Sequence, residues 1–319
     1  MKMKIFWIIG IVLLLVACRG NEGSTNTEAG EAKGTDEGDS TEQTITYLDE
    51  SYTIPKDVNN IITASLESME DAAALGVKPI GAVTIAGELP DYLADDLEGA
   101  ESIGEKMEPN YESVLSLKPD VILGSSKHQD DVVEQLNKIA PMIPYSHIAT
   151  DWKDNLRLMG ELSGKDAEAE QLITDYEKDA EDAKENISDD LQDKDVFVIR
   201  VRNGSLFVYP ADVYLNPVIY EDLGFEVPEV VTGAKAQEEI SLETLAEINP
   251  DVVFLQYENS ENDNKTAALD KILEDPIFKS IDASKNDKVF VNEIDPLAQG
   301  GTAWSKERFL DAAVEKLSE

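Results

Sequence analysis

The chain has 319 residues, with 66 acidic and 27 basic side chains, and its formal net charge is −39 at pH 7. A charge of this size excludes nucleic acid and other anionic polymers as general partners. The single cysteine excludes an internal disulfide, and the length suffices for two lobes of ordinary domain size.

The first residues have the pattern of a secretory signal peptide that ends at a lipidation site. Lys2 and Lys4 precede an apolar run, residues 5–17, which is short for a bilayer span. The run ends in the sequence LVAC, which is similar to a lipobox, where small residues precede the cut and the thiol accepts diacylglycerol. We expect residues 1–17 to be removed and lipid on Cys18 to hold the chain on the outer face of the cell membrane. The alternative is an uncleaved hydrophobic anchor.

The next stretch, residues 18–43, has the composition of a flexible tether. It is rich in Gly, Ser, Thr, Asn, Glu and Asp and almost free of apolar residues. Such a sequence buries too little apolar surface to offset the entropy lost on ordering. We therefore expect a lipidated, acidic linker here and a folded body over residues 44–319.

The body alternates strand-like and helix-like segments. Amphipathic segments, such as residues 130–139 with apolar side chains on one face, lie between short apolar runs. The runs suited to buried strands are residues 60–64, 80–83, 121–123, 196–199, 252–255 and 289–291. This alternation predicts α/β lobes with largely parallel sheets.

An internal repeat predicts that the two lobes are built alike. Residues 110–123 align with residues 241–254 at a constant offset, which places Pro119 on Pro250. In each copy a short helix ends before the proline and a buried strand follows.

A helical segment separates the two copies of the repeat. Residues 151–191 contain no strand-like run, and Gly164 is the weak point at which a helix would break. We expect one long helix here, with a break near Gly164, to join an N-terminal lobe over residues 44–150 to a C-terminal lobe over residues 192–319.

Four stretches of the body resemble the solute-binding proteins of iron-siderophore ABC importers, the lipoprotein receptors of Gram-positive bacteria. The segments that carry the resemblance are residues 75–81 (LGVKPIG), 117–122 (LKPDVI), 134–141 (EQLNKIAP) and 275–278 (DPIF). The resemblance implies two Rossmann-like lobes joined by a single long interlobe helix, as in class III periplasmic binding proteins. It also implies a shallow cleft between the lobes that closes little on its ligand.

The same resemblance implies a ligand and partners. Residues 209–217 (YPADVYLNP), with Arg200 and Arg202, are most similar to receptors for ferric hydroxamate or citrate-hydroxamate siderophores. The implied partners are that ferric siderophore and an ABC permease dimer with its ATPase. The implied receptor is a monomer with no intrinsic cofactor and no enzymatic activity.

Arg200 and Arg202 are the first candidates for ligand contacts. They lie two residues apart at the end of a strand-like run, so both side chains fall on one face, at the edge where α/β proteins bind ligands. The following Asn203-Gly204 predicts a hairpin turn. Two guanidinium groups suit the oxygens of an anionic ferric complex, and few acids lie near the pair in the sequence. The alternative is a pair of arginines bridged to surface acids.

The other candidates for ligand contacts are basic or aromatic. Similar family members carry a basic, ligand-facing residue after the 121–123 strand, and aromatic rings suit packing on the apolar backbone of a siderophore. The alternatives are a solvated lysine beside a surface histidine, and aromatic residues of the core or rim. The candidates are Lys127, His128, Tyr209, Tyr214, Tyr257 and Trp304.

Two glutamates, Glu112 and Glu243, occupy equivalent places in the repeat. The resemblance implies that one glutamate of each lobe docks into an arginine pocket of the permease dimer, and a symmetric placement suits a two-fold partner. Glu239 is the alternative in the second lobe. Solvated glutamates at helix starts are the alternative to docking.

Motifs of enzymes and metal sites are missing from the sequence. It contains no G-x-S-x-G, H-E-x-x-H or C-x-x-C pattern. His128 and His147 are its only histidines, which disfavours a receptor that holds bare zinc or manganese directly. The competing hypotheses are a haem or cobalamin receptor of the same fold, and a surface hydrolase or adhesin built on α/β lobes.

Overall fold

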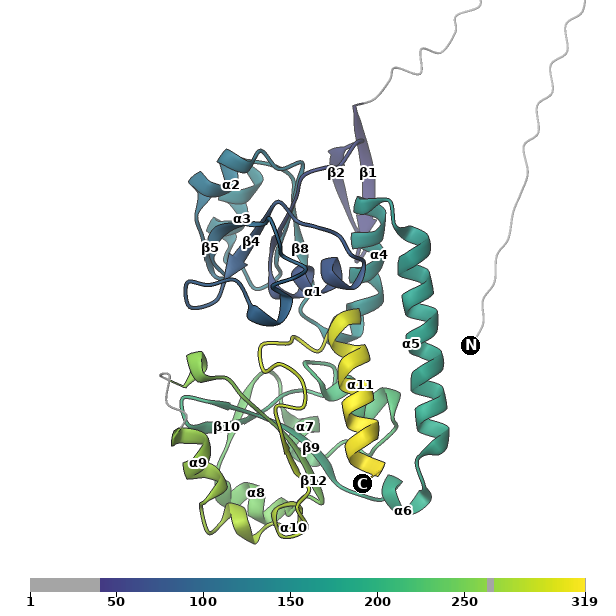
Figure 1. The fold of residues 1–319 in the computed structure, drawn as a ribbon, viewed down its shortest axis with the longest axis vertical. Coiled ribbons are helices and arrows are strands. Elements are labelled where there is room, and N and C mark those ends of the chain that lie inside the picture. Colours follow the sequence, from purple (N-terminus) through teal and green to yellow (C-terminus); the bar gives the residue numbers. More distant parts are fainter. Residues whose placement is uncertain (1–40, 263–266, 319) are drawn as a thin grey trace, which may run out of the picture. The chain divides into compact units, whose positions relative to one another are not determined.

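The computed structural model describes residues 41–262 and 267–318 (Figure 1). The predicted signal peptide, the lipidation site Cys18 and nearly all of the predicted linker lie outside these residues. Within the described ranges, none of the helices combines the length and the apolar character that a membrane span requires.

The first lobe contains a six-stranded sheet with the strand order β6-β5-β4-β3-β7-β8. Its strands are parallel except for β6, which is antiparallel to β5. The strands are β3 (Ile61–Ala64), β4 (Gly81–Thr84), β5 (Glu101–Glu105), β6 (Glu108–Pro109), β7 (Val121–Ser125) and β8 (Met142–Tyr145). The helices are α1 (Leu66–Ala74), η1 (Asp91–Leu93), α2 (Tyr111–Leu117) and α3 (Asp130–Asn137). Every residue of β3 and β7 is buried, as expected for parallel strands covered on both faces.

The second lobe contains a five-stranded sheet with the strand order β11-β10-β9-β12-β13. β10 is antiparallel to both neighbours, and the other pairs are parallel. The strands are β9 (Val196–Arg202), β10 (Ser205–Val208), β11 (Glu238–Ile240), β12 (Val252–Tyr257) and β13 (Val289–Val291). The helices are η3 (Val218–Asp222), α7 (Glu229–Gly233), α8 (Leu242–Ile248), η4 (Asn259–Glu261), α9 (Ala267–Leu273), η5 (Phe278–Ser280) and α10 (Asp282–Lys285). All six strands predicted from apolar runs are present.

The internal repeat has the same local structure in both lobes. The side chains of Asn110 and Ser241 cap α2 and α8 by accepting hydrogen bonds from backbone N–H groups of the first turn. Lys118 and Asn249 end these helices in the left-handed conformation, with φ of 51° and 55°. A proline and a buried strand follow each of them, so the repeat predicted from the sequence is confirmed.

The segment between the lobes forms two long helices rather than one continuous helix. η2 (Ala149–Asp151) leads into α4 (Trp152–Ser163), and α5 (Asp166–Asn186) and α6 (Asp189–Gln192) follow. The break is at Gly164, whose φ of +69° ends α4. α5 packs on α4 and reaches η3 of the second lobe, so it joins the lobes (Figure 1).

The chain crosses between the lobes again after β13 and ends in α11 (Ala303–Ser318), which packs on α1, α4 and α5. Gly300 in this crossing has φ of +75°, and a Cβ atom there would lie 2.4 Å from the carbonyl of Tyr214. Only glycine allows this close approach. Nearby, Ile148 of the first lobe and Val213 of the second form an isolated antiparallel bridge.

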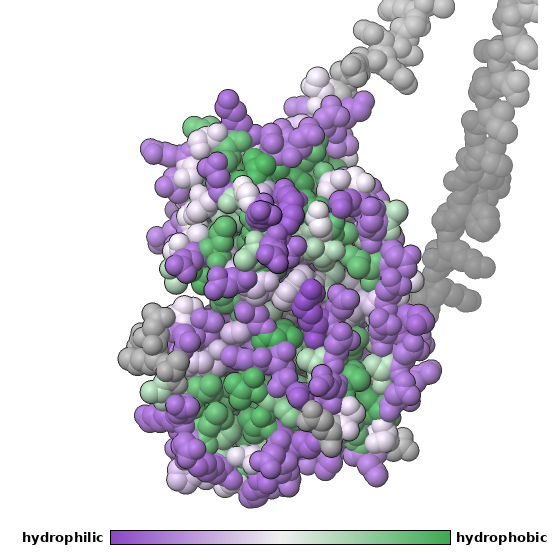
Figure 2. Space-filling view, in the orientation of Figure 1, coloured by the Kyte–Doolittle hydropathy of each residue, from purple (hydrophilic) through white to green (hydrophobic). Residues whose placement is uncertain are grey.

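A hairpin that the sequence analysis missed precedes the first lobe. It pairs β1 (Glu42–Tyr47) with β2 (Glu50–Pro55). The Tyr47 hydroxyl donates to Asn155 Oδ1 at 2.5 Å and accepts from the Ser146 N–H at 2.8 Å, so the hairpin is tied to the start of α4. On the outside of the described chain, hydrophilic side chains cover much of the face drawn in Figure 2.

Candidate functional site

A cavity of about 370 Å³ lies between the lobes, where β7 and β9 end. Its basic lining residues are Lys127, Arg200, Arg202 and Lys235. Its apolar and aromatic lining residues are Ile148, Tyr209, Pro210, Val213, Tyr214 and Ala236. Glu67 is the one acidic residue among those that line it in the described chain. In a protein of net charge −39, this excess of positive charge suits an anion.

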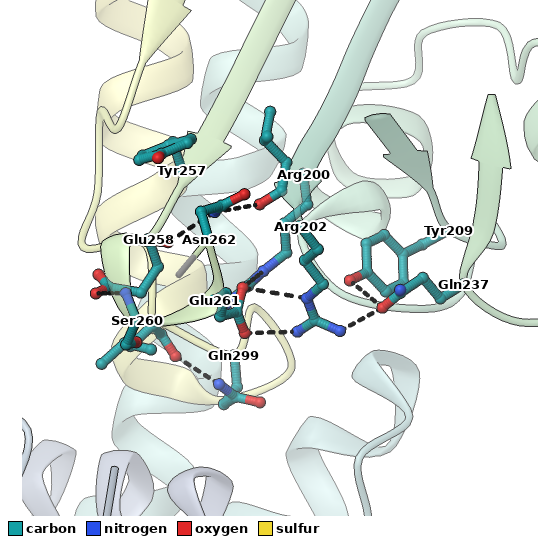
Figure 3. Close-up of polar contacts among 12 residues, drawn as sticks. Arg200, Arg202, Tyr209, Gln237, Tyr257, Glu258, Ser260, Glu261, Asn262 and Gln299 are labelled. Carbon is teal, nitrogen blue, oxygen red and sulfur yellow. Dashed lines mark hydrogen bonds and ion pairs between the residues drawn. The ribbon is translucent and has the colours of Figure 1, made fainter. Parts of the chain in front are cut away.

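Arg200 and Arg202 point to the same side of β9, and both bind Glu261 (Figure 3). The Nε atoms of Arg200 and Arg202 donate to the same oxygen of Glu261 at 2.8 and 3.1 Å. Nη2 of Arg202 donates to the other oxygen at 2.9 Å. The hairpin turn predicted at Asn203-Gly204 is present, with φ of 50° and 77°.

The expectation that few acids lie near the arginine pair holds along the sequence but is wrong in the folded structure, where Glu261 contacts both arginines. Glu261 belongs to η4, which follows β12, and β12 is the parallel neighbour of β9 in the sheet. Burial raises the pKa of Glu261, but Arg200 and Arg202 outweigh it and hold the pKa below its ordinary value. The pair thus carries its own carboxylate.

The two arginines differ in exposure. Arg200 is only 3% exposed, and its guanidinium carbon lies 5.1 Å from the ring centre of Tyr214. The side chain of Arg202 is 31% exposed and lies between Glu261 and Gln237 (Figure 3). Gln237 Oε1 accepts from Arg202 Nη1 and, at 3.0 Å, from the Tyr209 hydroxyl. Arg202 is therefore the arginine that a ligand in the cavity can reach. Arg200 is buried against Glu261 and Tyr214 and helps to hold Glu261 in place.

Basic side chains of the first lobe face this pair. Lys127 Nζ lies 3.8 Å from a carboxylate oxygen of the buried Glu67, and about half of the lysine side chain is exposed. The half-buried Lys106 lies close enough to Glu67, Lys127 and Arg200 to feel their charges. Burial lowers the pKa of Lys106, and Glu67 opposes that shift. The cavity is thus flanked by positive charge from both lobes.

Three of the predicted contacts lie outside the cavity lining. His128 is buried, with Nε2 2.9 Å from the carbonyl of Lys106, so it supports a loop of the first lobe. Tyr257 is buried in the core of the second lobe at the end of β12. Trp304 is buried at the start of α11, and the centre of its ring lies 3.9 Å from the guanidinium carbon of Arg308.

Sequence analysis missed several polar residues at the cavity. The missed residues that line it are Glu67, His147, Lys235 and Gln237. Glu261 and Lys106 lie next to lining residues, Glu261 against the two arginines and Lys106 close to Glu67 and Lys127. No sequence signal sets Lys106 and Lys235 apart, because other lysines, such as Lys78 and Lys288, also lie in loops. Over the described ranges, no group of three or more His, Cys, Asp or Glu side chains could hold a metal ion.

The predicted docking residues lie away from the cavity. Glu112 and Glu243 are exposed in the first turns of α2 and α8. Glu239 is exposed on β11. The equivalent placement of the first two follows from the repeat.

A second polar cluster joins α1 to the crossing that leads into α11. Glu70 of α1 is fully buried, and all of its hydrogen-bond donors are neutral. These donors are the Gln299 N–H at 3.0 Å and the hydroxyls of Thr302 at 2.5 Å, Tyr92 at 2.6 Å and Ser305. Burial raises the pKa of Glu70 to about 7, against the effect of these donors. The adjacent Asp71 accepts from the Tyr145 hydroxyl at 2.8 Å and the Ala303 N–H at 2.9 Å, and burial raises its pKa as well.

Known proteins share both the sequence and the fold. Residues 61–293 match the model of a family described as periplasmic binding protein. The iron-uptake system-binding protein of Bacillus subtilis (strain 168) is 46% identical over 311 residues, which are 97% of each chain. The probable siderophore-binding lipoprotein YfiY of the same organism is 32% identical over 260 residues. The aligned region covers 78% of this chain and 77% of YfiY.

A solved structure gives the most specific comparison. It is the triscatecholate siderophore binding protein FeuA from Bacillus subtilis, complexed with ferri-bacillibactin. The two chains are 48% identical, and they superpose with a TM-score of 0.83 over 86% of this chain and 98% of that chain. Its likeness confirms the two-lobed α/β fold predicted from the sequence.

Proposed function

Because the chain belongs to the periplasmic binding protein family, we propose that it is an extracytoplasmic receptor that binds a ferric siderophore and delivers it to an ABC permease. One observation carries the proposal. The interlobe cavity has four basic lining residues in a chain of net charge −39. A receptor of this kind binds and releases its ligand without making or breaking a bond, and it acts as a monomer.

We propose a ferric triscatecholate as the ligand class, in place of the hydroxamate or citrate-hydroxamate siderophore predicted from the sequence. The relatives do not single out hydroxamates, and the similar solved structure was determined with a triscatecholate. A ferric triscatecholate is a trianion, whereas a ferric trihydroxamate is neutral. The basic lining therefore favours the triscatecholate over the trihydroxamate.

The geometry supports contacts from both lobes. Arg202 offers a planar fork of N–H donors from the second lobe, and Lys127 a point charge from the first. Lys235 adds positive charge to the lining, and Lys106 adds positive charge close to Lys127 and Arg200. The ring of Tyr209 gives the ligand an apolar surface to pack on.

The test is a titration of the purified protein without its predicted signal peptide. Ferric triscatecholate, ferric trihydroxamate and their iron-free forms are added while tyrosine and tryptophan fluorescence is followed. We expect saturable quenching by the ferric triscatecholate, with an affinity at least about tenfold above that for the trihydroxamate. Arg202→Ala should lower that affinity by about tenfold or more, because a charged hydrogen-bond partner is lost.

Other ligands give distinct results in the same experiment. A haem or cobalamin receptor would quench with those ligands and show a Soret or corrin absorbance. A hydrolase or adhesin would be indifferent to every ferric chelate. Either result would overturn the proposed function.

We further propose that lipid on Cys18 anchors the receptor to the outer face of the cell membrane, and that Glu112 and Glu243 dock it on the permease dimer. The lipoprotein name of a relative supports the anchor, and the equivalent exposed positions of the glutamates support docking. Replacing either glutamate by lysine should abolish stimulation of the importer's ATPase while siderophore binding persists. Replacement of Glu239 tests the alternative.

A further inference from the structure

The loop that carries Glu261 is fixed in place by the β9–β10 hairpin. The carbonyl of Glu261 accepts a hydrogen bond from the Asn203 N–H at 3.0 Å. The amide of Asn262 donates to the Val201 carbonyl and accepts from the Gly204 N–H, both at 3.0 Å. The carboxylate of Glu261 is therefore held in a fixed place against the two arginines that line the cavity, unlike the ion pairs between exposed side chains elsewhere.

The two arginines share this one carboxylate unequally. Arg200 is almost fully buried beneath Tyr214, so its guanidinium stays with Glu261. Arg202 is partly exposed and reaches the cavity. One carboxylate against two guanidinium groups cancels half of the positive charge of the pair before a ligand arrives.

We propose that Glu261 is an internal counter-ion that competes with the anionic ligand for Arg202 and thereby lowers the affinity of the cavity for anions, most of all for strongly charged ones. In the structure described here, Nε and Nη2 of Arg202 donate to Glu261 and Nη1 donates to Gln237. A ligand oxyanion must share these donors or draw Arg202 away from Glu261. The Coulomb repulsion from Glu261 scales with ligand charge, so it costs a trianionic complex more than a weakly charged ligand. This inference rests on the proposed function, because it concerns the charge that the cavity selects.

A purely positioning role for Glu261 predicts the opposite effect of its removal. If the carboxylate only held the arginines in place, its loss would loosen Arg202 and weaken every ligand. If it competes, its loss leaves the buried Arg200 without a counter-ion, and the ligand takes that place. The sign of the change in affinity therefore separates the two roles.

The test is Glu261→Gln, which removes the charge and keeps the size. We expect the variant to bind ferric triscatecholate about tenfold more tightly than the wild type, with a steeper salt dependence, because one negative charge has left the site. Binding of the neutral ferric trihydroxamate should change by less than about twofold, since the Coulomb energy scales with ligand charge. Glu261→Asp, which keeps the charge, should retain wild-type discrimination.

A matched control comes from the same loop. Glu258 carries the same charge, and its carboxylate accepts from the Ser260 N–H at 3.0 Å. Glu258→Gln should leave triscatecholate affinity within about twofold, because the affected charge is not the partner of the arginines. An equal gain in both variants would assign the effect to overall charge and overturn the proposal.

A second readout needs no siderophore. Citrate, a small trianion, should raise the Tm of Glu261→Gln more than that of the wild type, because it replaces the missing counter-ion. Unchanged or weaker anion binding by the variant overturns the inference. A wild type that binds neither ferric complex overturns the proposed function instead, and the citrate measurement then decides the inference alone.

Discussion

Two carboxylates near the cavity, the partly buried Glu261 and the fully buried Glu70, have different hydrogen-bond partners. Glu261 accepts from two guanidinium groups, which outweigh burial and lower its pKa. Glu70, at the crossing between the lobes, accepts only from neutral donors, and burial raises its pKa to about 7. The partners of a carboxylate, rather than burial alone, decide its charge. Permanently charged groups thus lie at the cavity, whereas the crossing holds a group that titrates.

The largest effect on stability is expected when the buried, permanently charged Arg200 is replaced. Arg200→Ala leaves a cavity beneath Tyr214 and takes one of the two partners of Glu261. We expect the free energy of unfolding to fall by about 4 kcal/mol, because a large buried side chain and a buried ion pair are lost together. Urea unfolding at neutral pH measures the change.

The matched variant of this experiment is Arg202→Ala. Its side chain is 31% exposed, so its loss should cost less than about 1 kcal/mol. Equal losses for the two variants would contradict the distinction between a supporting arginine and a ligand-facing one.

The titrating carboxylate gives the next largest effect. The folded-state pKa of Glu70, about 7, lies above its ordinary value of 4.5, so the folded state binds its proton more tightly. The resulting stabilisation is complete below pH 4.5 and is lost as the pH rises to about 7. We expect the difference in unfolding free energy between wild type and Glu70→Gln to change by about 3 kcal/mol between pH 4 and pH 8. Urea unfolding across this range measures it.

The control for that profile is the exposed Glu112, since Glu112→Gln should give a pH dependence parallel to that of the wild type. A Glu70→Gln profile that also runs parallel to the wild type would show that Glu70 ionises normally. The neighbouring Asp71 has a pKa raised in the same direction, so the variant keeps part of the pH dependence.

The architecture could be predicted because it follows from local patterns. The runs that became β3, β7, β9 and β12 are apolar without interruption, as strands buried on both faces must be. The capped helices of the repeat depend on Asn110 and Ser241, which are visible in the sequence. The hairpin β1–β2 was missed because its polar, alternating sequence resembles the linker before it.

The site could be predicted only in part. Arg200 and Arg202 were found because their spacing on one strand fixes a shared face. Glu261 was missed because it meets them only through the pairing of β9 with β12, which brings distant segments together. Tyr257 and Trp304 follow a strand and a glycine pair as expected, but the sequence does not tell which way a side chain points, and both lie in the core.

The smallest effect concerns a single donor to Glu70. The Thr302 hydroxyl donates to Glu70 Oε2 and accepts from the Ser305 N–H at 3.1 Å at the start of α11. Thr302→Val keeps the shape and removes both hydrogen bonds, so we expect a loss of about 1 kcal/mol at pH 5.

The loss in Thr302→Val should grow as the pH rises through 7, because the hydroxyl stabilises the ionised form of Glu70 more than the protonated form. Removing it raises the folded-state pKa of Glu70 further, and stability is then lost over a wider pH range. Urea unfolding at pH 5 and pH 8 measures the growth, and Thr302→Ser, which keeps the hydroxyl, should remove it. A loss that is equal at both pH values would mean that Thr302 acts only as a helix cap. The contrast between the titrating carboxylate at the crossing and the permanently charged groups at the cavity would then depend on Glu70 alone.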